Sequence, residues 1–124
     1  MRHQSVLLVN PNRMRPPVAP LGLEYIAASL RRHGYEPRLS DLAFAEDWQT
    51  TLTKDVANAD PVAVAVSIRN IDDAYFASQD FVLEPIARVI RQLLETAHVP
   101  VILGGVGFSS APREILQYTG APYG

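Results

Sequence analysis

Three short segments of the sequence combine polar residues and glycines that could bind a ligand. Each directly follows an apolar run, at residues 5–9, 62–66 and 100–103. Short continuous apolar runs are typical of strands buried in a parallel sheet, and ligands of such sheets bind beyond the carboxyl ends of the strands. We therefore expect one binding site, built from NPNRMR at 10–15, SIRN at 67–70 and GGVGF at 104–108.

Several familiar chemistries do not fit these segments. The fingerprint GxGxxG belongs after the first strand, where this chain has NPNRMR, and GK[ST] occurs nowhere, so neither dinucleotide nor P-loop binding is supported. A phosphoacceptor domain of this topology needs an aspartate where Ser67 stands and acids where Asn10 stands. No histidine is expected near Ser67, which argues against a nucleophilic serine.

Metal binding is not indicated either. The chain has no cysteine, which excludes disulfides, thiolate zinc sites and an iron–sulfur cluster held by this segment alone. The three histidines lie far apart, without the spacing of metal ligands. The acids Asp72, Asp73 and Asp80 could bind a hard cation, but a solvated acidic surface is the more common role of such a group.

The paired glycines Gly104 and Gly105 have two readings. Without Cβ atoms they let a flat or bulky ligand approach the backbone closely, and their amides can donate hydrogen bonds. They could equally serve only to turn the chain. The sequence leaves both readings open.

The segments between the apolar runs predict helices. The first begins at Pro20 and ends before Gly34. One face of this helix would carry apolar residues, at Leu23, Ile26, Ala27 and Leu30. Further helices are predicted at 46–58, at 86–97 and from Pro112 onward, with Ser110 as the cap of the last.

Strands and helices alternate along the chain, which predicts right-handed crossovers and an α/β fold with a doubly wound parallel sheet. The spacing matches a flavodoxin-like strand order, 2-1-3-4, with segment 36–42 as an edge strand because it contains Pro37. A central strand at 62–68 would be buried on both faces. A fifth edge strand would only be starting at 121–124, so we expect residues 1–124 to be one domain of a longer protein.

The charge and hydropathy of the chain exclude some partners. A formal net charge of -2 and a pI near 5.9 give no basic surface for phosphate backbones, so nucleic acid is not an expected partner. No apolar run approaches the length that spans a bilayer, and the N-terminus lacks a signal-peptide pattern. We expect a cytoplasmic protein without membrane contact.

The ordered set of motifs resembles the N-terminal cobalamin-binding domain of cobalamin-dependent radical S-adenosylmethionine enzymes. The resemblance spans nearly the whole chain and rests on VNPN with PLGLEYIAASLRRHGYE, on SIRNIDD and on VILGGVGFSSAPREIL. SIR and GG correspond to the SxL and GG elements of cobalamin-binding domains. The resemblance implies a Rossmann-like cobalamin-binding fold.

The resemblance also implies roles for individual residues. Ser67, Gly104 and Gly105 would line the slot that receives the nucleotide tail of cobalamin, and Gly107 and Phe108 would flank it. The full set of expected cofactor-binding residues is Asn10, Asn12, Arg13, Ser67, Arg69, Asn70, Gly104, Gly105, Gly107 and Phe108.

Two departures from the family pattern concern the cobalt. Many cobalamin domains carry DxHxxG after the first strand, whereas segment 10–22 contains no histidine, and Arg69 replaces the leucine of SxL. We therefore expect base-off cobalamin without a protein histidine ligand. Arg69, or a residue of segment 10–15, would lie nearest the cobalt, and a guanidinium has no lone pair with which to coordinate it. An ion pair with the tail phosphate or at the surface is an equally good reading of Arg69.

The resemblance implies a parent enzyme whose other parts are not in this chain. Its radical S-adenosylmethionine domain, with a CxxxCxxC motif and a 4Fe-4S cluster, would lie downstream, and this segment alone would be inert. The parent would be a methyltransferase acting on an unactivated carbon or phosphorus centre; some relatives instead catalyse ring contraction or cyclisation, and one branch methylates an indole carbon of tryptophan. The alternative is a non-catalytic flavodoxin-like regulatory or interaction domain that lacks a phosphoacceptor.

Overall fold

The computed structural model describes residues 4–12, 21–69 and 83–124. Strands and helices alternate in the described residues, as predicted from the sequence. In chain order they are β1 (Ser5–Asn10), α1 (Leu21–Arg32), β2 (Glu36–Asp41), α2 (Trp48–Ala59), β3 (Ala63–Ser67), α3 (Leu83–Thr96), β4 (Val101–Gly104), α4 (Val106–Ser110) and α5 (Pro112–Thr119).

The four strands form one parallel sheet in the order β2-β1-β3-β4, which confirms the predicted topology. β2 is an edge strand, as the position of Pro37 indicated. Beyond β4, Tyr123 forms a single parallel bridge with Ile102, and the Leu103 amide donates to the Tyr123 carbonyl at 3.0 Å. This bridge lies where the sequence predicted the start of a fifth strand.

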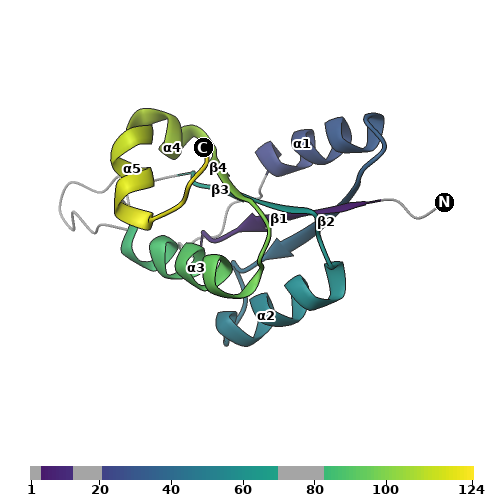
Figure 1. Ribbon diagram of the computed structural model, residues 1–124, viewed down its shortest axis with the longest axis horizontal. Helices are drawn as coiled ribbons and strands as arrows, with labels where there is room; N and C mark the ends of the chain where they lie inside the picture. The colour runs from purple at the N-terminus through teal and green to yellow at the C-terminus, as the bar shows by residue number, and fades with distance from the viewer. Residues whose placement is uncertain (1–3, 13–20, 70–82) are drawn as a thin grey trace.

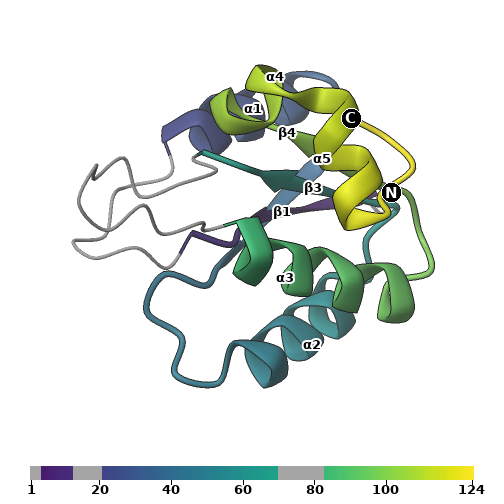
Figure 2. The same ribbon diagram turned by 90° about the vertical axis from the view of Figure 1, so that its left-hand side faces the viewer.

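Helices cover the two faces of the sheet unequally. Figures 1 and 2 show α2 and α3 on one face, and α1 and α4 on the other. The face below α2 and α3 carries the main core, because every second residue of the strands points into it. The strands contribute Leu7, Val9, Val64, Val66, Val101 and Leu103 to this core, and α3 contributes Ile86, Val89, Ile90 and Leu93.

The opposite face has a much smaller core. Val6, Leu8 and Leu23 form it, with Ala27, Leu30 and Ala65 packed against them. The predicted apolar face of α1 is wrong at Ile26, which is 44% exposed. The reason is that α1 packs on β1 and β2 through Leu23 and Ala27, and Ile26 lies to the side of that contact.

The expectation that the central strand is buried on both faces is also wrong. Val64 and Val66 of β3 are buried in the main core, but Ala63, Ala65 and Ser67 are only half-buried. These three residues point to the α1 side of the sheet, where α1 lies mainly over β1 and β2. A strand sequence of alternating valine and alanine therefore has one covered and one largely open face.

The starts of α2 and α5 are capped differently. Asp47 caps α2, because its side chain accepts a hydrogen bond from the Thr50 amide at 3.2 Å. Ser110 does not cap α5: residues 106–110 form the separate short helix α4, and the Ser110 hydroxyl donates back to the Gly107 carbonyl at 2.6 Å. In the part of the chain that the structure describes, no helix is long and apolar enough to cross a membrane.

Candidate functional site

The carboxyl ends of β3 and β4 bring two predicted site residues together. Ser67 and Gly104 are direct neighbours in the parallel register of these strands. Just beyond them, the Ile68 amide donates to the Gly104 carbonyl at 2.8 Å. By strand alternation both Ser67 and Gly104 face the α1 side of the sheet.

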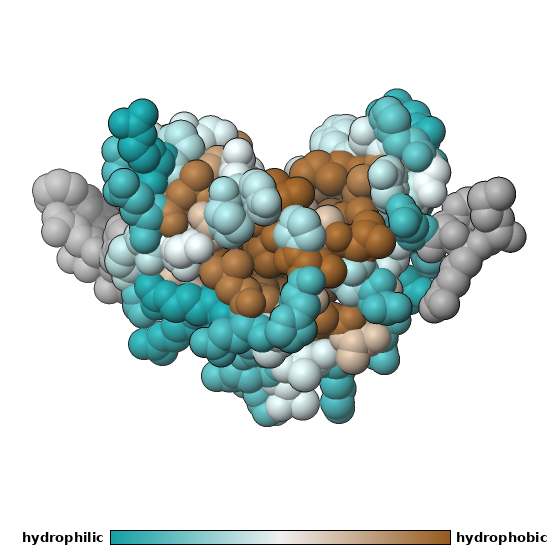
Figure 3. Space-filling model, viewed as in Figure 1, coloured by the Kyte–Doolittle hydropathy of each residue, from teal (hydrophilic) through white to brown (hydrophobic). Residues whose placement is uncertain are grey.

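An open trough leads away from Ser67 and Gly104 along the α1 side of the sheet. Figure 3 shows it as an apolar hollow between two raised flanks, which are α1 and α4 in the same view of Figure 1. By strand alternation, the residues that face this side of the sheet are Ala63, Ala65 and Ser67 of β3 and Ile102 and Gly104 of β4. Ile102 is 42% exposed.

Gly104, at the carboxyl end of β4, borders open space on the α1 side of the sheet. A Cβ atom placed on this residue would meet no atom of residues 4–12, 21–69 or 83–124 within 4 Å, so the described part of the chain leaves open space beside the Gly104 backbone. The residue therefore has no packing reason to be glycine. Its absence of a side chain leaves room for a ligand, which is the first of the two readings of the paired glycines.

Gly105 and Gly107 are required by the fold, which is the second reading of the glycines in this loop. Gly105 has a φ of +100°, and a Cβ there would lie 2.5 Å from the Ile68 carbonyl oxygen. A Cβ on Gly107 would lie 2.9 Å from the carbonyl oxygens of both Ile68 and Arg69, and the Gly107 amide donates to Ile68 at 2.8 Å. Both glycines thus let the start of α4 pack directly on the backbone that follows β3.

Phe108 lies in the main core. Its side chain is 7% exposed and rests directly against Gly124, beside the residues that pair with β4. Its backbone amide is 3.4 Å from the Ile68 carbonyl. The backbone of Phe108 therefore lies close to the end of β3, and its ring lies in the interior.

Asn10 is buried at the carboxyl end of β1, with 5% of its surface exposed. Its side-chain Nδ2 donates to Asp41 Oδ1 at 3.0 Å, and its Oδ1 accepts from the Asn12 amide at 3.3 Å. Sequence reasoning missed Asp41. The signal for it is the polar residue at the end of the neighbouring strand, in register with Asn10.

The remaining predicted site residues lie at the same edge or outside the described residues. Arg69 is exposed just after β3, and Asn12 is half-buried just after β1. Arg13 and Asn70 lie outside the described residues. Among the residues that the structure describes, no group of three or more histidine, aspartate or glutamate side chains could hold a metal ion.

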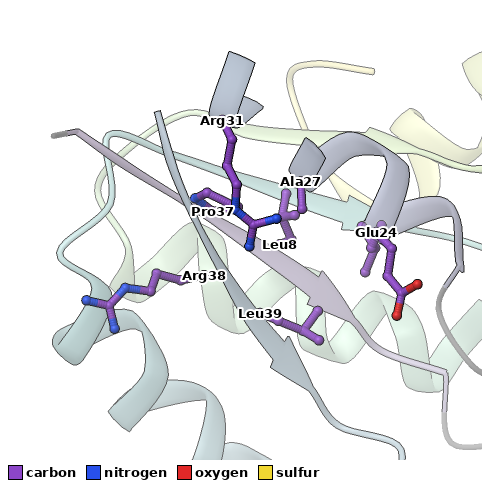
Figure 4. A pocket seen from close by; sticks show the side chains of 8 residues that line it. Leu8, Glu24, Ala27, Arg31, Pro37, Arg38 and Leu39 are labelled. Atoms are coloured by element: carbon purple, nitrogen blue, oxygen red, sulfur yellow. The ribbon is translucent and has the colours of Figure 1, made fainter. Parts of the chain in front are cut away.

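A separate pocket lies between α1 and the strands β1 and β2. Its volume is about 360 Å³, and Figure 4 shows the side chain of Arg31 reaching along it. Leu8, Leu23, Glu24, Ala27, Arg31, Pro37, Arg38 and Leu39 line it. None of the predicted site residues takes part, so this pocket is distinct from the Ser67–Gly104 site.

Comparisons with known proteins agree with the fold and the motifs. The B12 binding domain family matches residues 12–124. The chain is 35% identical over 125 residues to tryptophan 2-C-methyltransferase of Streptomyces laurentii, a match that covers 100% of this chain and 21% of that protein.

Two structures of the radical S-adenosylmethionine methyltransferase TsrM from Kitasatospora setae superpose with a TM-score of 0.90. One holds cobalamin and a 4Fe-4S cluster; it is 35% identical, with 96% of this chain and 21% of that chain covered. The other holds tryptophan and the SAM analogue aza-SAM; it is 36% identical, with 94% and 22% covered. This chain thus spans about a fifth of the length of these relatives.

Proposed function

Because this chain belongs to the B12-binding domain family, we propose that it binds cobalamin as the methyl-carrier domain of a radical S-adenosylmethionine methyltransferase. The observation that carries the proposal is the pairing of Ser67 with Gly104 at the head of the open trough. A slot for a long, flat ligand needs small side chains along one wall, and the small strand residues on this side of the sheet are Ala63, Ala65, Ser67 and Gly104, beside the larger Ile102.

The residues of the site have separate tasks in this proposal. Ala63 and Ala65 form an apolar floor that excludes water from the nucleotide tail, and the Ser67 hydroxyl can donate to or accept from its polar atoms. Gly104 leaves the width that the tail requires. Cobalamin, when bound, supplies a cobalt atom that can carry a methyl group.

Arg69 is the described residue best placed to approach the lower face of the corrin. It is exposed at the end of β3, two residues beyond Ser67. Its guanidinium is always protonated and offers no lone pair, so it would shield the cobalt without coordinating it. The cobalt would then lack a nitrogen ligand from this chain.

The parent reaction is part of the same proposal. The chain has no cysteine, so the cysteines of a 4Fe-4S cluster and the site for S-adenosylmethionine would belong to a further domain, downstream in the same protein. Tryptophan is the substrate best supported, because the relative that matches the whole chain is a tryptophan 2-C-methyltransferase and a similar structure holds tryptophan.

Mixing the purified chain with hydroxocobalamin tests the proposal. We expect a coloured complex that survives desalting, with an absorption spectrum that lacks the signature of a nitrogen-ligated cobalt. Gly104→Val should weaken binding at least about tenfold, because the new side chain fills the space that the tail needs, whereas Ala57→Val, on the exposed face of α2, should not.

A colourless wild-type chain, both alone and in the full-length protein, would overturn the proposal in favour of a regulatory or interaction domain. A nitrogen-ligated spectrum would overturn the proposed role of Arg69 alone. Circular dichroism of Gly104→Val separates blocked binding from misfolding.

A further inference from the structure

Asn10 joins the ends of two strands through its side chain. The amide is buried, with the residue 5% exposed, and both of its polar ends are occupied. Nδ2 donates to Asp41 Oδ1 at 3.0 Å, and Oδ1 accepts from the amide of Asn12 at 3.3 Å. A residue placed by sequence among the ligand contacts is therefore engaged within the protein.

Asp41 extends the same network to the segment that follows β2. Its Oδ1 also accepts from the Ala43 amide at 3.1 Å, and the Leu42 amide donates to the Asn10 carbonyl at 3.0 Å. Ala43 and Leu42 are themselves buried, which anchors this end of the network. The backbone at Asn12 is thus tied, through two side chains, to a fixed part of the core.

The position of Asn12 bears on the proposed cofactor site. β1 lies directly between β2 and β3, so the backbone that leaves β1 is adjacent to the backbone that leaves β3 at Ser67 and Arg69. A shift of Asn12 would change the width of the site on the side opposite Gly104.

We propose that Asn10 and Asp41 are positioning residues for cobalamin: their hydrogen bond fixes Asn12 beside the end of β3, and neither side chain needs to touch the cofactor. This inference rests on the proposed function. It assigns to Asp41, which carries no motif of its own, an indirect effect on cofactor affinity.

A reciprocal exchange of the two residues tests the proposal in the complete chain. Asn10→Asp places two carboxylates face to face and should weaken hydroxocobalamin binding about tenfold, the usual effect of losing one hydrogen bond. Asp41→Asn keeps an oxygen that can accept from the side-chain amide of Asn10 and the backbone amide of Ala43. It should therefore weaken binding less, about threefold or below. The double exchange restores the bond between the two side chains with donor and acceptor reversed, but the amide nitrogen at position 41 can no longer accept from the Ala43 amide. Affinity should therefore recover only in part, to a value between those of Asn10→Asp and wild type.

Ser40→Ala is the matched control. Ser40 precedes Asp41 in β2, and its buried hydroxyl donates to Asp55 Oδ2 at 2.6 Å, which joins β2 to α2. This variant should lower the urea midpoint of the chain and leave its affinity for hydroxocobalamin unchanged.

Urea midpoints of all variants without cofactor distinguish positioning from stability. If Asn10→Asp lowers the midpoint but binds hydroxocobalamin as tightly as wild type, or if the double exchange restores stability without affinity, the positioning role is wrong and the proposed function stands. If wild type itself does not bind, the proposed function fails and this inference fails with it.

Discussion

At the scale of single residues, Gly104 and Gly105, at the end of β4, are glycines for different physical reasons. Gly104 borders empty space, whereas Gly105 combines a φ of +100° with a backbone on which a Cβ would lie 2.5 Å from the Ile68 carbonyl oxygen. The first property admits a ligand and the second holds two loops together. The motif GG therefore joins one residue suited to binding with one required for folding.

This difference predicts the effects of alanine at two glycines. Gly105→Ala should lower the free energy of unfolding by at least about 2 kcal/mol, because both the backbone conformation and the contact with Ile68 oppose a side chain. Gly34→Ala is the control: Gly34 has a φ of +86°, but a Cβ there would meet no atom within 4 Å, so its cost should be about 1 kcal/mol. Urea unfolding measures both, and equal costs would contradict the steric argument.

At the scale of elements, a polar cluster joins α3 to α5 on the surface. The Tyr118 hydroxyl donates to Glu84, and Arg91 lies 3.4 Å from the Glu84 carboxylate and 5.6 Å from the centre of the Tyr118 ring. The hydrogen bond from Tyr118 lowers the pKa of Glu84. The same bond raises the pKa of Tyr118.

Tyr118→Phe should therefore reduce stability only within a pH window. The contribution of Glu84 is present above the ordinary pKa of a glutamate and is lost as pH falls through its lowered pKa. The contribution of Tyr118 is present below the ordinary pKa of a phenol and is lost as pH rises through its raised pKa. Urea midpoints should differ most from wild type between about pH 5 and 9. They should converge only as pH falls below the lowered pKa of Glu84 or rises above the raised pKa of Tyr118.

Tyr25→Phe on α1 is the control for this prediction, since it removes a hydroxyl from a side chain that is 79% exposed. A Tyr118→Phe deficit of constant size from acid to alkaline pH would show that the lost contact is not this hydrogen bond. Because the cluster lies at the surface, the whole effect should be small and should decrease with added salt.

At the scale of the whole molecule, helices cover one face of the sheet more fully than the other. One is closed by α2 and α3 over a continuous core, and the other is open along the trough between α1 and α4 (Figures 2 and 3). In the proposed function, the nucleotide tail of cobalamin would cover part of this open face. The cofactor should then contribute to the stability of the fold.

Thermal unfolding with and without ligand checks this expectation. Hydroxocobalamin at about one hundred times its dissociation constant should raise the free energy of unfolding by about 2.7 kcal/mol, or the midpoint by roughly 10 °C. Cobinamide, which lacks the nucleotide tail, should produce a clearly smaller shift at the same concentration. Equal shifts would mean that the tail does not occupy the trough.

Much of the architecture could be predicted from local sequence. The apolar runs and the amphipathic pattern of α3 are strong enough to place these elements, and alternation of strands with helices determines a parallel sheet. Ile26 and Ser110 were wrongly interpreted because periodicity and capping preference describe one helix in isolation. The exposure of Ile26 depends on which strands α1 covers. Ser110 is the last residue of α4 and therefore does not cap α5.

The sequence alone determined the strand order and the segments that meet at the carboxyl edge of the sheet, because both follow from the spacing of apolar runs and the handedness of crossovers. Only the tertiary structure decided which glycine borders open space, that Phe108 is a core residue and that Asn10 is bonded to Asp41. These properties depend on contacts between residues distant in the chain, and no local pattern of residue types records which neighbour a given side chain will meet.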